Sequence, residues 1–241
     1  MNTEPRTSVG TGMTLGSIVD RHPSLARELE HRELDYCCGG GVTLGQACRD
    51  LGLDPAVVAA ELSDAICDEP PAPWSAMGLS ELVDHLVETH HRYLWAELPR
   101  LGALLDRVVE AHREHHPELT DIAECFAAIR NELEPHLTEE ERVLFPAITE
   151  LDTAPMAPSF GFGSIGRPIS EVLHDHHELG GLLRRLRELS DGYRAPADAC
   201  ASYTALFTGF AELDSDTHLH IHKENNVLFP RVIHLEQRRM S

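Results

Sequence analysis

The chain carries one eleven-residue pattern twice, H-x3-E-x2-V-L-F-P, first at His136 and again 84 residues later at His220. Two matches of this length in one chain indicate an internal repeat. Positions i and i+4 of a helix lie one turn apart on the same face, so each histidine projects beside the glutamate of its own copy, Glu140 or Glu224. The repeat therefore predicts two related helices, each of which presents an imidazole and a carboxylate together.

Apolar residues on the same faces indicate that both pairs point into a core. Ile129, Leu133 and Leu144 continue the face of the first copy, and the second copy has an equivalent stripe that starts at Phe210. A buried carboxylate is costly unless it is paired or bound to a metal. One such pair is explained equally well by a buried hydrogen bond. Two pairs that converge on one core favour a metal site.

The rest of the chain has the periodicity of helices, and no stretch alternates convincingly with period two. A crossover rich in proline and glycine lies between the second and third long helical segments. Ser80 is the expected N-cap of the first long helix. The pattern predicts an all-α protein with a four-helix bundle over residues 79–237. We expect its helices at about residues 80–108, 119–151, 169–189 and 196–237.

A shorter helical pattern precedes the bundle. Thr14 can cap a helix that ends near Leu29, Thr43 can cap a second, and Asp54, which is followed by proline, can cap a third. The sequence DEPPAPWSAMG that follows is typical of a linker. We therefore expect a small helical N-terminal domain over residues 12–68.

The chain has 16 histidines, so the ligands on the first long helix must be chosen by helical face. His91 belongs to an unbroken apolar stripe that runs from Val87 through Leu98. His90 belongs to a shorter stripe that ends at the charged Glu97. The pattern favours His91 as the ligand and leaves His90 as the alternative.

On the third long helix, His176 shares a face with Val172 and Leu183, whereas His174 and His177 align with charged residues and are expected to face water. The remaining histidines, His222 among them, are assigned to the surface, to caps or to support of the ligands. The predicted ligands are His91, His136, Glu140, His176, His220 and Glu224.

Four histidines and two glutamates suit two transition-metal ions, each bound by two imidazoles and both bridged by the carboxylates. A single zinc ion needs only three or four ligands, and the string H-E-x-x-H is absent from the sequence. We therefore expect two iron ions, with manganese as the alternative. Six protein ligands leave positions for an oxo or hydroxo bridge and for dioxygen, nitric oxide, peroxide or a thiolate.

The order H-x3-E on the second and fourth helices, with single histidines on the other two, resembles the hemerythrin-like bundle. The strings E-E-x-x-L-F-P and E-N-N-V-L-F-P are similar to those of the repair-of-iron-centres family of di-iron proteins. The string L-D-Y-C-C-G-G, which starts at Leu34, resembles the signature of that family's ScdA-type N-terminal domain. The resemblance covers roughly residues 12–235.

The resemblance implies a stress-response function, the repair of iron–sulfur clusters damaged by nitric oxide or oxidants. Iron donation is the expected mechanism, and damaged iron–sulfur proteins are the expected partners. Two alternatives stay open at the same site. One is the reduction of nitric oxide, and the other is reversible binding and sensing of dioxygen or nitric oxide.

Two adjacent cysteines, Cys37 and Cys38, precede three glycines and the expected helix start at Thr43. Adjacent cysteines are commonly inert, and a disulfide between neighbours is strained. A thiolate near a helix N-terminus is stabilised and reactive, however. With the resemblance, this makes Cys37 and Cys38 candidate catalytic residues for iron transfer or nitrosyl exchange. The other cysteines are expected to be packing residues: Cys48, Cys67, Cys125 and Cys200.

The formal net charge of −20 argues against nucleic acid and anionic membranes as partners. No apolar run reaches the roughly 18 residues that a membrane-spanning helix needs, and the N-terminus lacks the pattern of a secretory signal. These features predict a cytoplasmic protein. A homodimer is compatible with the sequence, although no residue pattern indicates one.

Overall fold

The computed structural model describes residues 8–67, 72–156 and 158–240. Within these ranges the regular structure is helical, and the extended pairings are the isolated bridges Thr14–Thr43 and Phe160–Gly163. The prediction of an all-α protein is confirmed. In this part of the chain no helix combines the length and the apolar character that crossing a membrane requires.

Contacts divide the chain into two compact units. The first contains the described residues up to Gly78 together with Ile221–Pro230, and the second contains Leu79–His220 with the residues from Arg231 onwards. The segment Ile221–Pro230 belongs to the fourth predicted long helix, yet it groups with the N-terminal residues. The domain boundaries expected from the sequence stay predictions.

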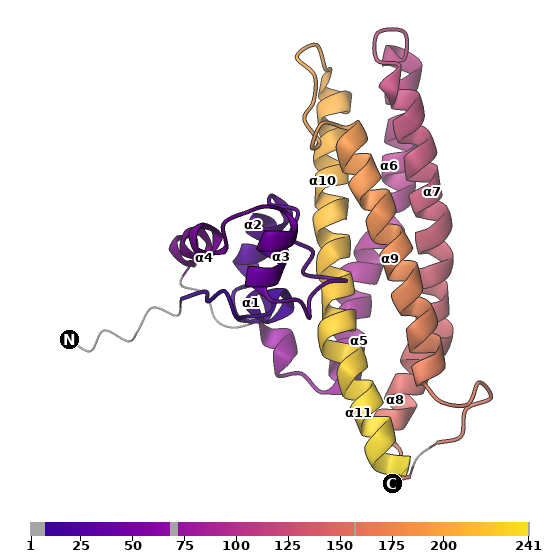
Figure 1. Cartoon of the computed structure of the whole chain (residues 1–241). Coiled ribbons are helices and arrows are strands. Elements are labelled where there is room, and N and C mark those ends of the chain that lie inside the picture. The colour runs from indigo at the N-terminus through magenta and orange to yellow at the C-terminus, as the bar shows by residue number, and fades with distance from the viewer. Residues whose placement is uncertain (1–7, 68–71, 157, 241) are drawn as a thin grey trace. The chain divides into compact units, whose positions relative to one another are not determined.

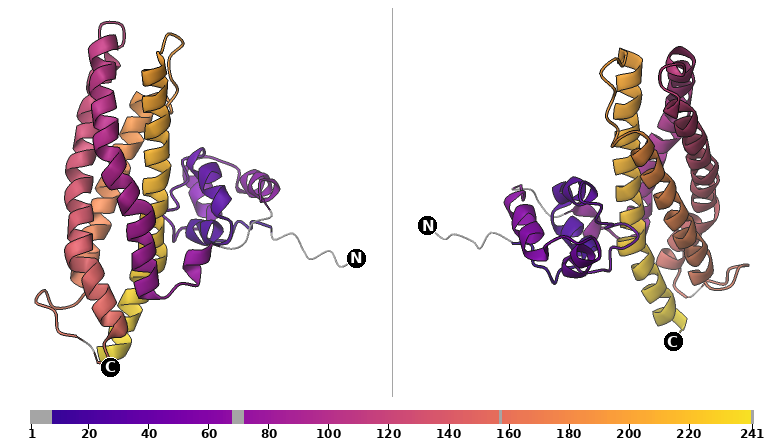
Figure 2. Two further views of the ribbon diagram at one scale, coloured as in Figure 1. Left: turned by 180° about the vertical axis from the view of Figure 1, so that it is seen from behind. Right: turned by 45° about the horizontal axis from the view of Figure 1, so that its top comes forward.

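The bundle is built from four long helical runs, and its helices α6, α7, α9 and α10 run side by side, with consecutive members pointing in opposite directions (Figures 1 and 2). Apolar residues at helical spacing form its core, among them Leu94, Ile129, Leu183 and Leu206, which are all buried. The first run consists of α5 (Leu79–Leu86), η3 (Val87–His91) and α6 (Arg92–His112). The second consists of α7 (Glu118–Glu139), η4 (Glu140–Leu144) and α8 (Phe145–Thr153). The third is α9 (Gly166–Leu189), and the fourth consists of α10 (Ala201–His222), η5 (Lys223–Leu228) and α11 (Phe229–Met240).

The segments η3, η4 and η5 are π-helical, so among the described residues three of the four long runs contain a wider turn. The repeated V-L-F-P string ends at Pro146 just after η4 and at Pro230 just after η5. Proline lacks the N–H group that a regular α-helix needs, and a π turn is one way to accommodate the interruption. Single π turns inside α-helices occur frequently at functional sites. The apolar periodicity did not predict these turns.

Two expected helix starts differ from the structure. Helix α5 begins at Leu79, so Ser80 is not its N-cap. The Ser80 backbone N–H and hydroxyl both donate to Oδ2 of Asp152, at 3.1 and 2.7 Å, so a carboxylate from α8 caps this helix. The fourth run begins at Ala201 rather than near residue 196. Positive φ angles at Asp191, Gly192 and Tyr193 turn the chain after α9.

The N-terminal unit contains short helices whose caps agree with the sequence. Thr14, Thr43 and Asp54 cap α1, α3 and α4 through their side-chain oxygens. The expectation that the first helix continues to Leu29 is wrong, because Pro23 interrupts it. Residues 68–71 of the predicted linker lie outside the described ranges. The elements are α1 (Leu15–Arg21), η1 (Pro23–Leu25), α2 (Ala26–Glu30), α3 (Leu44–Asp50), α4 (Pro55–Asp64) and η2 (Pro73–Ser75).

Candidate metal centre

The six predicted ligands lie at the turns where the helices depart from regular geometry, or one turn away from them, with one exception. The exception is His176, which lies within the uninterrupted α9. All six side chains are removed from solvent: His136 is 6% exposed, and the other five are 0% exposed. Their places are the end of η3 (His91), the last turn of α7 (His136), the start of η4 (Glu140), the last turn of α10 (His220) and the second residue of η5 (Glu224).

The ligand atoms of these residues form two groups, within each of which all atoms lie within 4.8 Å of one another. His91 and His220 belong to the first group, and His136 and His176 belong to the second. Glu140 and Glu224 are common to both groups. The sequence predicted two imidazoles for each of two ions and two carboxylates shared between them, and these ligand roles stay predictions.

The spacing of the imidazole nitrogens fits a transition-metal ion. His91 Nε2 lies 3.1 Å from His220 Nε2, and His136 Nε2 lies 3.1 Å from His176 Nε2. Two nitrogens bound at about 2.1 Å and at right angles would lie about 3.0 Å apart. Oε2 of Glu140 is 3.5 Å from His91 Nε2 and 3.3 Å from His136 Nε2, so one carboxylate reaches both pairs. Bound cations would offset the cost of burying two carboxylates in an apolar core.

Carboxylates outside the cluster orient two of the imidazoles. His91 Nδ1 is 3.0 Å from Oε1 of Glu141, an oxygen that also accepts a hydrogen bond from Nε1 of Trp95 at 2.8 Å. A proton held on Nδ1 leaves the Nε2 lone pair facing the cluster. His136 Nδ1 is 3.8 Å from Oδ2 of Asp175, and the contact with this imidazole holds the pKa of Asp175 below its usual range. Asp175 is therefore a carboxylate at neutral pH.

His90, the alternative on the first helix, is buried but belongs to neither group. Its Nδ1 is 2.9 Å from Oδ1 of Asp216, and its ring stacks on that of His220 with centroids 5.4 Å apart. His90 and His91 are both buried, and both lie at the end of the π turn η3. The geometry favours His91, while the ligand role of each residue stays a prediction. His174 and His177 are exposed, as expected.

Cys37 and Cys38 lie in a turn that Asp35 organises. Oδ1 of Asp35 accepts hydrogen bonds from the backbone N–H groups of Cys37 and Cys38, at 3.1 and 2.9 Å, and from the Cys37 thiol at 3.2 Å. The contact with the Cys38 sulfur and burial raise the pKa of the Cys37 thiol well above its usual range. The expected stabilisation of a thiolate at this position is therefore wrong for Cys37. The catalytic role of the pair stays a prediction.

The other cysteines divide into two kinds. Cys48 and Cys125 are buried in α3 and α7, as expected of packing residues. Cys67 and Cys200 are exposed and lie outside the helices, so the packing expectation is wrong for these two.

His222 was assigned only in general terms from the sequence, and the structure gives it a specific environment in the N-terminal unit. It is completely buried, with Nε2 3.0 Å from Oδ1 of Asp20 and Nδ1 3.3 Å from the carbonyl oxygen of Tyr36. The same Asp20 oxygen accepts a hydrogen bond from Nε1 of Trp74 at 3.1 Å. A difference between the two copies of the repeat was the sequence signal for this role. The second copy has His222 where the first has Thr138.

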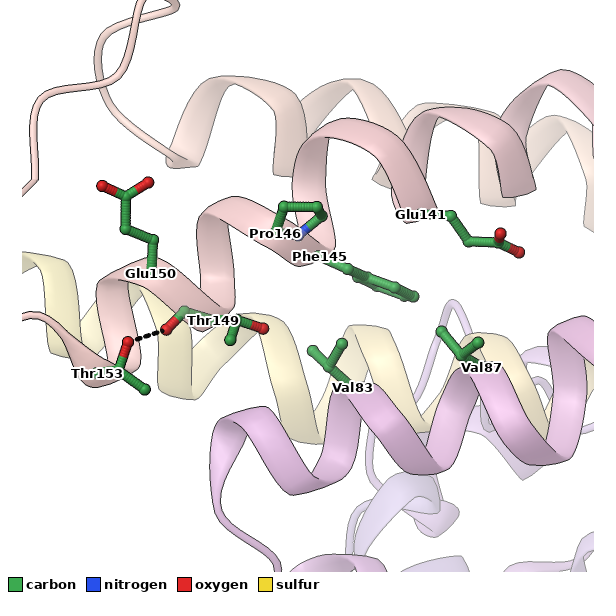
Figure 3. A pocket seen from close by; sticks show the side chains of 8 residues that line it. All are labelled: Val83, Val87, Glu141, Phe145, Pro146, Thr149, Glu150 and Thr153. Atoms are coloured by element: carbon green, nitrogen blue, oxygen red, sulfur yellow. Dashed lines mark hydrogen bonds between the residues drawn. The ribbon is translucent and has the colours of Figure 1, made fainter.

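An open cavity of about 630 Å³ lies in the bundle next to the residues that contact His91. Figure 3 shows Val83 and Val87 on one side of it and Phe145 and Glu141 on the other. The Phe145 ring packs 5.3 Å from the His91 ring, and Glu141 is the carboxylate that contacts His91 Nδ1. A single layer of side chains therefore separates this cavity from His91.

Two family profiles match the chain. The profile described as the hemerythrin HHE cation binding domain matches residues 82–232, which is more than half of the chain. The profile named ScdA_N, described as a domain of unknown function, matches residues 11–66. The expected resemblance in both parts of the chain is confirmed.

Curated relatives match nearly the full length. Proteins named iron-sulfur cluster repair protein YtfE are 34% identical in Musicola paradisiaca and 32% identical in Enterobacter sp. (strain 638). A protein of the same name in Escherichia coli is 30% identical. These alignments cover 91% of this chain and 94–96% of the relatives. The chain therefore belongs to the hemerythrin HHE cation-binding family, together with the YtfE-type iron–sulfur cluster repair proteins.

Proposed function

We propose that this protein takes part in the repair of iron–sulfur clusters and holds two iron ions for that purpose. The relatives that carry this name match over nearly their whole length, which supports the function. The observation that carries the proposal is the sharing of Glu140 and Glu224 by two pairs of buried histidines. Two carboxylates that reach both imidazole pairs suit a pair of ions better than a single ion.

In this proposal the protein's own residues bind and orient the iron. Each pair of imidazoles would hold one ion, Glu140 and Glu224 would be shared between the two pairs, and Glu141 fixes the ring of His91. The bound iron supplies the metal that a damaged cluster has lost. Protonation of the ligands competes with metal binding, so acidification of the cluster would favour release of iron to a recipient.

Reactivation of a damaged enzyme tests this function. The iron-loaded protein is mixed with an enzyme whose iron–sulfur cluster has been nitrosylated or oxidised, and the recovered activity is compared with that given by free iron at equal concentration. We expect greater recovery with the protein, and loss of that advantage in Glu140→Ala. Glu139→Ala, which changes the exposed neighbour, is the matched control. Recovery no better than with free iron would show that repair by donation is wrong.

A second function, binding or reduction of nitric oxide, is favoured by the cavity beside His91. Val83, Val87 and Phe145 give it apolar walls that suit a small, weakly polar gas molecule, and Phe145 packs directly on His91. Nitrous oxide formed during anaerobic turnover of the reduced, iron-loaded protein would support reduction. Stoichiometric nitrosyl formation without gas would exclude it, and a reversible spectroscopic titration would then support binding or sensing.

A further inference from the structure

The N-terminal unit contains a second set of potential metal ligands, separate from the six residues of the bundle. Ligand atoms of Asp35, Cys37 and Cys38 all lie within 4.8 Å of one another. The two sulfurs are 3.7 Å apart, and Sγ of Cys37 is 3.2 Å from Oδ1 of Asp35. The described residues therefore bring two thiols and one carboxylate to a single point.

These distances match those of ligands around one ion. Two thiolates bound at about 2.3 Å with a tetrahedral angle lie about 3.8 Å apart. A thiolate and a carboxylate oxygen on the same ion lie about 3.1 to 3.6 Å apart for angles between a right angle and the tetrahedral value. Side chains of adjacent residues diverge in helices and strands, so their convergence here is a property of this particular turn.

The turn is held in place by hydrogen bonds from both of its sides. Oδ1 of Asp35 accepts from the N–H groups of Cys37 and Cys38. The Asn226 carboxamide donates to the Cys37 carbonyl oxygen at 2.8 Å and to the Tyr36 carbonyl oxygen at 3.3 Å. A fixed backbone keeps the two sulfurs together before an ion arrives, which lowers the entropic cost of binding.

Glycine at position 40 is a further requirement of this turn. A Cβ atom there would lie only 2.5 Å from the Tyr36 carbonyl oxygen, whereas one at Gly41 would meet nothing within 4 Å. The Gly40 carbonyl oxygen accepts a hydrogen bond from the N–H of Gly16 at 2.9 Å, which ties the turn to α1. The glycine therefore permits the close packing that positions the two cysteines.

We propose that Asp35, Cys37 and Cys38 form a site for one thiophilic divalent cation of the Fe²⁺, Co²⁺ and Zn²⁺ class. Two sulfurs and one oxygen select these borderline ions over Mg²⁺ and Ca²⁺, which prefer oxygen ligands. Binding replaces the two thiol protons with one cation and releases both protons to solvent, and no electron is transferred. Three protein ligands leave a fourth position for water or for a thiolate of another protein.

The exposure of the site makes it suitable for exchange. Cys37 is buried, whereas Asp35 is exposed and Cys38 is partly exposed, so the open coordination position can face solvent. With iron as the cation, this would be a second binding place for the metal that the protein donates. That last role rests on the proposed function, whereas the existence of the site does not.

A titration with Co²⁺ tests the site in the full-length, iron-loaded protein, kept anaerobic with a phosphine reductant. Cobalt bound to thiolates gives a near-ultraviolet sulfur-to-metal charge-transfer band, and the six bundle ligands contain no sulfur. We expect this band to saturate at one equivalent of cobalt. An absence of the band after several equivalents would overturn the proposal.

Variants identify the ligands. Cys38→Ser, at a partly exposed position, should remove most of the band, while Asp35→Asn should keep the backbone hydrogen bonds and weaken cobalt binding by about tenfold or more. Cys67→Ser, at an exposed cysteine outside the helices, is the matched control and should leave the titration unchanged. Far-ultraviolet circular dichroism verifies folding. A band that survives Cys38→Ser, or that is lost in Cys67→Ser, would contradict the assignment.

The result is independent of the repair assay. A cobalt band together with failed reactivation would contradict the proposed function and leave the metal site intact. Successful reactivation without the band would support the proposed function and contradict the metal site.

Discussion

The two copies of the repeat, His136–Pro146 and His220–Pro230, keep the same residues on their inner faces and different residues on their outer faces. Histidine, glutamate and the V-L-F-P string are identical, and a π turn lies at the equivalent place in both. The five remaining positions all differ; among them, Thr138 corresponds to His222, Glu139 to Lys223, Glu141 to Asn225 and Arg142 to Asn226.

The different outer faces have different partners. In the first copy, Glu141 contacts His91 and Trp95, so this side chain supports the candidate metal centre. In the second copy, His222 and Asn226 contact the turn around Tyr36 in the N-terminal unit. The comparison shows that two copies of one helix can keep the same buried candidate ligands while their outer side chains contact different parts of the molecule.

The inner faces of the two copies should contribute equally to iron binding. The substitutions with the largest expected effect test this equivalence. Glu140→Ala and Glu224→Ala should each remove both irons or abolish their magnetic coupling, because each carboxylate belongs to both groups of ligands. Metal analysis with Mössbauer spectroscopy measures the effect. Two unchanged spectra would contradict the bridging arrangement, and an effect of only one substitution would show that the copies are not equivalent.

The outer face of the first copy should influence metal binding without being part of the cluster. Glu141→Ala should weaken iron affinity by about 10- to 100-fold, because His91 loses the acceptor that orients its ring. A competition titration against a chelator measures the affinity. Glu141→Gln retains an acceptor oxygen and should recover most of the loss, so equal effects of the two substitutions would argue against an orienting role.

The outer face of the second copy should influence stability and leave iron binding at the six bundle ligands unchanged. Asn226→Ala removes the donor to the Cys37 and Tyr36 carbonyl oxygens and should lower the free energy of unfolding by about 1–3 kcal/mol. Urea denaturation measures the change, and faster hydrogen exchange around Cys37 should accompany it. Arg142→Ala, at the equivalent exposed position of the first copy, should change stability by less than about 0.5 kcal/mol. Loss of iron from the six bundle ligands in Asn226→Ala would remove the distinction between the two faces.

The smallest expected effect concerns a side-chain contact between the loop that joins α6 to α7 and the loop that joins α9 to α10. His116 lies 2.9 Å from Glu118 and 3.2 Å from Asp198, and these hydrogen bonds raise the pKa of its imidazole. A raised pKa in the folded state means that the stabilisation is complete below the unfolded value of about 6.5 and is lost as the pH rises through the folded value. Asp198→Asn should therefore lower the melting temperature slightly at about pH 6, and the difference should vanish at about pH 9. An equal difference at both pH values would exclude the ion pair as its cause.

The repeat and the apolar stripes were sufficient to predict the all-α fold and the convergence of six residues. They worked because the burial of His176 and of the two copies follows ordinary helical spacing. The same spacing placed His90 on a shorter stripe and did not predict that it is buried as completely as His91. Ser80 was mistaken for a cap because the true cap, Asp152, is distant in sequence. Local sequence patterns carry no record of such tertiary partners.

The environment of the two cysteines was also beyond sequence reasoning. Gly40 packs closely against the Tyr36 carbonyl oxygen, a contact that no local sequence pattern specifies. The raised pKa of Cys37 follows from its contact with Cys38 and from burial, which only the folded turn determines. Residue spacing therefore located the candidate sites more successfully than it described their electrostatics.

The π turns have a consequence for anyone who wishes to rebuild this centre in an artificial scaffold. Each residue of an α-helix advances the face by about 100°, so replacing a π turn with regular helix would rotate every later side chain by roughly that amount. A scaffold of ideal straight helices could accept His176 as it stands, because α9 is regular. The other three helices would each need an inserted residue at the right turn. Copying the six ligands alone would give an incorrectly aligned site.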